Sequence, residues 1–205
     1  MPTKAWFPTF IYDAPLGGRG AAALTRSLLD DCHKLRAHDT AGQRWCRKNY
    51  AAGYTSYASM SNLHRTFSAF TELEKKIRPH VGRFVRGLDV DLQNGRLEMT
   101  NCWVNIMSRH AVHALHLHPL SVVSGTFYVA APRGCSRIRF EDPRLGRFMG
   151  APPKKADCRP ENRQHVTYDV APGKLILFES WLRHEVASNP TAGERVSISF
   201  NYDWV

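Results

Sequence analysis

The stretch His116-Leu117-His118-Pro119-Leu120-Ser121 lies near the middle of the 205-residue chain and decides how the rest is interpreted. Its two histidines stand two residues apart at the end of a predicted strand, and alternate residues of a strand face the same side. Pro119 stops the strand, because proline cannot donate to a sheet ladder. Two imidazoles that face one point favour a metal ion as their common partner. We therefore interpret much of the remaining chain as the barrel that holds this pair.

A third ligand is expected from a distant part of the sequence, because a facial triad closes around one side of a metal. His184 is the best candidate, since it follows a Pro172-Gly173 turn and an apolar strand. His110 and His113, just before the pair, are interpreted as part of a turn that enters the site. The remaining histidines lie in helix or loop contexts and are predicted to be surface or capping residues: His33, His38, His64, His80 and His165.

Arg195, Ser197 and Ser199 fall on one face of the last predicted strand, with apolar residues between them. The strand follows the turn at 189–193, and a hairpin here would place Arg195 beside the strand that ends at His184. A guanidinium group with a neighbouring hydroxyl suits a carboxylate held at some distance from the metal. The sequence thus indicates a metal site with an adjacent anion site.

The composition is that of a folded globular protein, with 43% hydrophobic and 11% aromatic residues. The length suits one domain, and the sequence contains no run of about 18 apolar residues that could span a membrane. The N-terminus has no apolar signal segment, so we expect a soluble, cytoplasmic protein. Five cysteines without a CxxC pair argue against a disulfide framework and favour reduced thiols.

The chain carries a net charge of +10, with its basic residues spread along the sequence. It contains no zinc-finger, RNP-type or helix-turn-helix signature, so nucleic acid is not the expected partner. Residues 143–164 and 50–61 are candidate lids. Their Arg, Lys and Tyr content suits a small-molecule or macromolecular substrate that is anionic or polar.

Two predicted helices precede a series of strands. The helices span 21–37 and 66–87, and Pro79 is expected to split or kink the second. A short edge strand is predicted over 5–12, and 38–62 is interpreted as a polar loop. Further strands, interrupted by a long loop over 142–165, are predicted over residues 96–108, 122–131, 136–141, 165–170, 174–178 and 195–203. This order predicts an α+β, mainly β fold, with helices behind a β-sandwich or jelly roll.

Several stretches are similar to a known family. They begin with residues 6–9, 53–57, 103–105 and 116–128, and end with three blocks whose order is the specific part: 140–144, 178–184 and 194–201. On these stretches nearly the whole chain resembles the Fe(II)/2-oxoglutarate-dependent oxygenases. Within that superfamily it resembles a group of small bacterial and phage proteins.

The resemblance implies a double-stranded β-helix, a jelly roll that carries iron at one mouth. It also implies Fe(II) as cofactor and 2-oxoglutarate as co-substrate, which is converted to succinate and CO2 while a substrate C–H bond is hydroxylated. His116 and His184 correspond to the two histidine ligands of the family. His118 stands where the family usually has Asp or Glu, so the resemblance implies a site of three histidines.

The same resemblance assigns the anion site. Arg195 would pair with the distal carboxylate of 2-oxoglutarate, assisted by Ser197 and by Tyr128 on the strand that follows the histidine pair. We expect one oxygenase-like domain over 1–205. Within it, 1–95 would be helical and loop support, and 96–205 would supply the barrel strands and the metal site.

Several alternatives remain open at the level of the sequence, and one of them is a basic binding or scaffold protein with a degenerate metal site. A carboxylate from Glu141, Asp142 or Glu179 could complete the metal site in place of one histidine, and a divalent metal other than iron could bind. A cupin-like metal-binding protein or dioxygenase that does not use 2-oxoglutarate would also show an HxH motif and a distant histidine. The stretch 119–124 lacks the glutamate that usually follows HxH in cupins.

Overall fold

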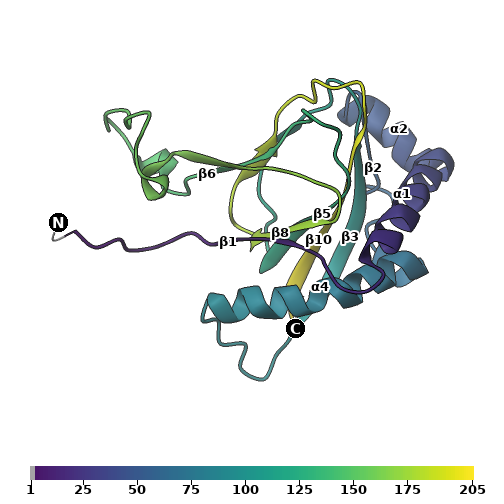
Figure 1. Cartoon of the computed structure of the whole chain (residues 1–205), viewed down its shortest axis with the longest axis horizontal. Coiled ribbons are helices and arrows are strands. Elements are labelled where there is room, and N and C mark those ends of the chain that lie inside the picture. Colours follow the sequence, from purple (N-terminus) through teal and green to yellow (C-terminus); the bar gives the residue numbers. More distant parts are fainter. Residues whose placement is uncertain (1–2) are drawn as a thin grey trace.

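The centre of the protein is a pair of antiparallel sheets (Figure 1). The structure is a computed structural model that describes residues 3–205, so the first two residues of the predicted domain lie outside the described part. The strands are β1 Ile11–Pro15, β2 Gly53–Thr55, β3 Leu97–Met107, β4 His113–His116, β5 Val123–Ala130, β6 Ile138–Glu141, β7 His165–Tyr168, β8 Lys174–Glu179, β9 His184–Val186 and β10 Arg195–Trp204. This combination of helices with antiparallel sheets agrees with the predicted α+β class.

The chain passes back and forth between the two sheets. The larger has the order β1-β8-β5-β10-β3-β2 and the smaller β4-β9-β6-β7. β4 therefore lies between β3 and β5 in sequence but in the opposite sheet, and β9 lies likewise between β8 and β10. As a result, strands that are neighbours in sequence present side chains to a common interior from two sides. The buried apolar residues of this interior include Phe140 and Phe178, whose rings pack against each other.

Within residues 3–205, four helices accompany the sheets: α1 Ala21–His38, α2 Thr40–Asn49, α3 Leu63–Thr66 and α4 Ser68–Gly87. They lie along one side of the larger sheet (Figure 1), and α1 contacts β5 and α4. α1 and α4 match the two predicted helices. α4 is continuous through Pro79, so the predicted split is wrong. One apolar face runs the full length of α4 and packs against the core, which holds both halves in line: Phe70, Leu73, Ile77, Val81, Phe84 and Val85.

Two predictions about the N-terminal half need correction. Residues 38–62 are not a plain loop, because they contain α2 and β2. Asp39 caps α2 by accepting a hydrogen bond of 2.8 Å from the amide of Gly42, a contact that sequence periodicity does not reveal. The predicted strand over 5–12 is also misplaced. Pairing begins at Ile11, where β1 joins the edge of the larger sheet beside β8.

The segment between β6 and β7 is the long connection that the sequence predicts. It contains only two short 3-10 turns, Leu145–Arg147 and Pro160–Asn162. In Figure 1 it projects away from the barrel on the same side as the N-terminal segment. Among residues 3–205, all five cysteines are free, and none of the helices is both long and apolar enough to cross a membrane.

Candidate metal and anion site

Three histidines converge at the smaller sheet. His116 ends β4, His184 begins β9, and the two are paired across these strands. His118 follows two residues after β4 and is fixed by its backbone amide, which donates to the carbonyl of Ser180 at 2.9 Å. One side-chain nitrogen from each ring lies within 4.8 Å of those of the other two. Strand pairing thus brings together ligands that are almost seventy residues apart in sequence.

The rings are oriented by hydrogen bonds on their Nδ1 atoms. Every partner is an oxygen that accepts, so Nδ1 carries the proton and Nε2 keeps its lone pair. His116 donates to the carbonyl of Ala114 at 2.7 Å, and His184 donates to the carbonyl of Leu182 at 3.0 Å. His118 donates to Oδ1 of Asn201 at 2.6 Å. Three imidazoles with free lone pairs, aimed at one point, fit a transition-metal ion.

Burial keeps two of these rings, those of His118 and His184, neutral. Desolvation lowers the pKa of His118 to about 4, against the opposing effect of the hydrogen bond with Asn201. Desolvation, followed by the neighbouring His116, holds the pKa of His184 well below its ordinary value of 6.5. Neutral imidazole is the form that binds a metal, so no proton has to leave these two rings at pH 7.

The carboxylates considered as alternative ligands are engaged or placed elsewhere. Glu141 accepts from Arg183 at 2.8 Å, and Asp142 pairs with Arg144 at 2.9 Å. Within residues 3–205, the ligand cluster consists of the three histidines alone, so Glu179 does not join it either.

Two histidines predicted to be surface or capping residues are in fact buried. His64 belongs to α3, and His80 belongs to α4. His80 contacts the hydroxyl of Tyr12 through Nδ1 at 2.8 Å and the carbonyl of Leu16 through Nε2 at 3.1 Å. Neither belongs to the metal cluster.

Arg195 is a buried cation without an acidic partner. Only 2% of it is exposed, and within residues 3–205 no Asp or Glu forms an ion pair with it. Its Nη2 donates to the hydroxyl of Tyr128 at 3.3 Å, and its Nη1 lies 3.5 Å from Oγ of Ser197. A buried charge is costly unless it is paired. An anionic ligand would supply that missing partner.

The histidines and Arg195 share one cavity in the barrel interior. Its wall also includes the polar face of β10, namely Ser197 and Ser199. The predicted hairpin between His184 and Arg195 is wrong, because β10 pairs with β3 and β5 while β9 pairs with β4 and β6. Arg195 instead enters the cavity from the opposite sheet.

Sequence reasoning missed two polar residues of this region. Asn201 orients His118 and also accepts a hydrogen bond of 2.8 Å from Ser124. Asn105 lines the cavity, donates to Ser199 at 3.0 Å, and has no hydrogen-bond partner for its Oδ1 among the described residues. The alternation along β10 could have revealed Asn201, because it continues the face of Arg195 and Ser199.

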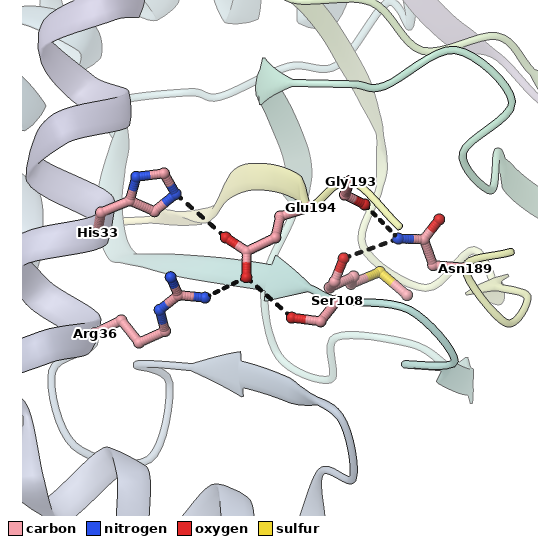
Figure 2. Close-up of polar contacts among 7 residues, drawn as sticks. His33, Arg36, Ser108, Asn189, Gly193 and Glu194 are labelled. Atoms are coloured by element: carbon pink, nitrogen blue, oxygen red, sulfur yellow. Dashed lines mark hydrogen bonds and ion pairs between the residues drawn. The ribbon is translucent and has the colours of Figure 1, made fainter. Parts of the chain in front are cut away.

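A polar network anchors Glu194, the residue just before β10 (Figure 2). The carboxylate of Glu194 accepts from Arg36 of α1 at 2.5 Å and from Ser108 at 3.0 Å, and it lies 3.4 Å from Nε2 of His33. Burial acts to raise the pKa of Glu194, but these partners hold it below its ordinary value. α1 is thereby tied to the residue next to Arg195.

The turn before β10 is closed by Asn189, which is buried. Its side-chain amide donates to the carbonyls of Met107 at 3.0 Å and Gly193 at 3.1 Å (Figure 2). These bonds join the end of β3 to the start of β10, so the position of Arg195 is fixed from both flanks.

The barrel strands match a family model. Residues 101–201 match the family described as "Putative 2OG-Fe(II) oxygenase". This region belongs to the 2OG-Fe(II) oxygenase family. The match to the oxygenase model includes all three histidines, Arg195 and Asn201. No curated protein sequence matches the chain.

Solved structures share the fold of this chain. A Pseudomonas putida prolyl-4-hydroxylase is 15% identical with a TM-score of 0.60, over 95% of this chain and 92% of that one. The non-haem α-ketoglutarate-dependent epimerase SnoN from nogalamycin biosynthesis is 15% identical with a TM-score of 0.62, over 95% and 76%. HygX from Streptomyces hygroscopicus, solved with nickel and 2-oxoglutarate, is 15% identical with a TM-score of 0.60, over 95% and 83%. The whole chain, helices included, therefore follows the fold of these enzymes.

Proposed function

We propose that the protein is a non-haem iron(II), 2-oxoglutarate-dependent dioxygenase that hydroxylates a C–H bond of its substrate. The observation that carries this proposal is the shared cavity of the histidine triad and the unpaired Arg195. The two sheets would be the two halves of the double-stranded β-helix that the sequence resemblance implies. The single domain would span the chain, with the helices as its support.

The residues present fit the metal. His116, His118 and His184 would hold it through Nε2, since their Nδ1 atoms are already engaged. When bound, iron(II) would activate O2 and couple the conversion of 2-oxoglutarate to succinate and CO2 with the transfer of one oxygen atom to the substrate. The chain's own contribution is to orient these rings and to keep His118 and His184 neutral.

The missing carboxylate ligand is consistent with a dianionic co-substrate. Three neutral imidazoles leave the charge of a divalent ion uncompensated, and Arg195 adds a further positive charge to the cavity. 2-Oxoglutarate carries two negative charges, which would offset most of this excess in a poorly solvated space. Its distal carboxylate would bind the guanidinium of Arg195, and the hydroxyls of Ser197 and Tyr128 would fix its orientation.

Binding of 2-oxoglutarate is the first test. Calorimetry on Mn(II)-loaded protein without O2 should show binding by the wild type and its loss in Arg195→Ala. Arg139→Ala is the matched control, because this half-exposed arginine pairs with Glu185 outside the cavity. Aerobic reactions with Fe(II) should then yield succinate and a product with one added oxygen atom. A protein that binds metal but not 2-oxoglutarate would support the cupin-like alternative instead.

The substrate is proposed to be anionic. The connection between β6 and β7 carries five exposed basic residues for which no ion pair occurs within residues 3–205: Arg147, Lys154, Lys155, Arg159 and Arg163. Such a basic segment would attract the negative groups of a substrate. Once a substrate is found, Lys154→Ala/Lys155→Ala should raise its KM and leave the Kd of 2-oxoglutarate unchanged.

A further inference from the structure

A fourth histidine, His113, lines the same cavity as the triad. It begins β4, and its ring centre lies 5.8 Å from that of His116. On its other side it meets Tyr50, which follows α2 and lies outside the residues matched by the family model. The Tyr50 hydroxyl is 3.3 Å from Nδ1 of His113, and the two ring centres are 4.9 Å apart. A residue of the helical half of the chain thus contacts the wall of the barrel cavity.

Tyr50 is held firmly in this position. It is buried, and its backbone amide donates to the carbonyl of Cys46 at 2.8 Å. Its ring lies directly against Gly53, where a Cβ atom would come within 2.3 Å of the ring. The tyrosine therefore requires glycine at the start of β2, and its hydroxyl is directed at His113.

The hydrogen bond to Tyr50 gives His113 the opposite tautomer from the triad. Within residues 3–205 the Tyr50 hydroxyl has no other hydrogen-bond partner, and a buried hydroxyl without an acceptor is costly, so donation to Nδ1 of His113 is the favoured arrangement. The single proton of the neutral ring is then on Nε2. Burial, followed by the neighbouring His116 and the positive charge of Arg195, disfavours a second proton on His113. His113 consequently presents an N–H group to the cavity, which cannot bind a metal but can donate to an oxygen.

We infer that His113, oriented by Tyr50, donates a hydrogen bond from Nε2 to a carboxylate oxygen of the dicarboxylate co-substrate. This inference rests on the proposed function. Arg195 supplies charge to the ligand, and His113 supplies a neutral donor that adds no further positive charge to the cavity. His113 is thus a co-substrate-binding residue, and Tyr50 is a positioning residue that selects its tautomer.

The tautomer can be measured without metal or co-substrate. Nitrogen-15 NMR of the imidazoles should show the proton of His113 on Nε2 in the wild type. Tyr50→Phe should move it partly or wholly to Nδ1. Tyr12→Phe is the matched control, because Tyr12 makes the same hydroxyl contact with Nδ1 of His80 away from the cavity. It should change only the His80 signals. A wild-type His113 protonated on Nδ1 would overturn the inference.

Co-substrate affinity is the second measurement. In Mn(II)-loaded protein, His113→Leu should weaken 2-oxoglutarate binding about tenfold to hundredfold, as expected for one lost hydrogen bond to a charged group. Tyr50→Phe should weaken it less, and Tyr12→Phe should leave it unchanged. His113→Gln should recover most of the affinity, because its side-chain amide can donate from a similar position, whereas a purely structural role would not be rescued in this way.

The outcomes separate the two proposals. Failure of the wild-type, metal-loaded protein to bind 2-oxoglutarate would overturn the proposed function and this inference with it. Wild-type binding with an equal Kd in His113→Leu would overturn the inference alone. The affinity for Mn(II) should be the same in all these variants, since His113 is not a ligand.

Discussion

Arg36 of α1 donates a hydrogen bond of 2.5 Å to Glu194, the residue that immediately precedes Arg195. Helix and barrel are therefore joined one residue away from the proposed co-substrate anchor. Both side chains are about one-third exposed, so solvent screens part of this interaction.

Removing the charge of Glu194 should loosen this connection. Glu194→Gln should lower the free energy of unfolding by about 1 kcal/mol, because it replaces charge-assisted hydrogen bonds with neutral ones. The affinity for 2-oxoglutarate should fall by a few-fold, since the start of β10 is less well fixed. Urea denaturation and calorimetry measure the two effects. Glu72→Gln, which breaks the more exposed pair with Lys76, is the control and should change neither.

Arg195→Met should affect binding and stability in opposite directions. It should weaken 2-oxoglutarate binding by at least about a hundredfold, the usual effect of removing one member of a buried charged pair. It should also raise the Tm of the ligand-free protein, because a buried charge without an acidic partner is replaced by an apolar side chain of similar length. Thermal denaturation with and without 2-oxoglutarate tests both effects. A lower Tm in the ligand-free variant would contradict this account of Arg195.

Asn201→Ala should reduce metal affinity about tenfold to a hundredfold, although Asn201 is not a ligand. The reason is that its Oδ1 fixes the ring of His118 through Nδ1, and such supporting residues commonly contribute this much. Metal titration with a competing chelator provides the measurement. Asn101→Ala, at a half-buried position of the neighbouring strand β3, should bind metal as the wild type does.

The metal-free protein should lose stability as the pH falls from 6.5 towards 4. Burial lowers the pKa of His118 to about 4 and that of His184 well below 6.5, whereas both would titrate near 6.5 in the unfolded chain. The unfolded state therefore takes up more protons in this range, and each such group contributes a slope of up to about 1.4 kcal/mol per pH unit. Urea denaturation across the range measures this slope. His118→Gln should make it shallower, and an unchanged slope would argue against a neutral buried His118.

The strands of residues 96–205 can be predicted from the sequence more accurately than the elements of residues 1–95. Alternating polar and apolar residues predict β3, β5 and β10 within two residues, because each of these strands buries a full apolar face. The same alternation places Arg195, Ser197 and Ser199 on one wall, where they do line the cavity. α2 escaped prediction because it is short and is started by Asp39 rather than by a long apolar period.

Pairing between distant strands is what the sequence could not supply. Arg195 follows His184 by only eleven positions, which suggests a hairpin, yet the two lie in different sheets. The role of His113 depends likewise on Tyr50, which reaches it only through the folded arrangement of α2 and β2. A histidine's hydrogen-bond partner decides whether it offers a lone pair or a proton, and that partner is fixed by tertiary structure alone.

The division of the site between the two sheets has a mechanical consequence. His116 and His184 belong to the smaller sheet and Arg195 to the larger. A metal-bound dicarboxylate that also binds Arg195 would link the two sheets directly and stabilise them against separation. Hydrogen exchange should then slow together in β4, β9 and β10 when metal and 2-oxoglutarate are both present, and metal alone should protect only the smaller sheet.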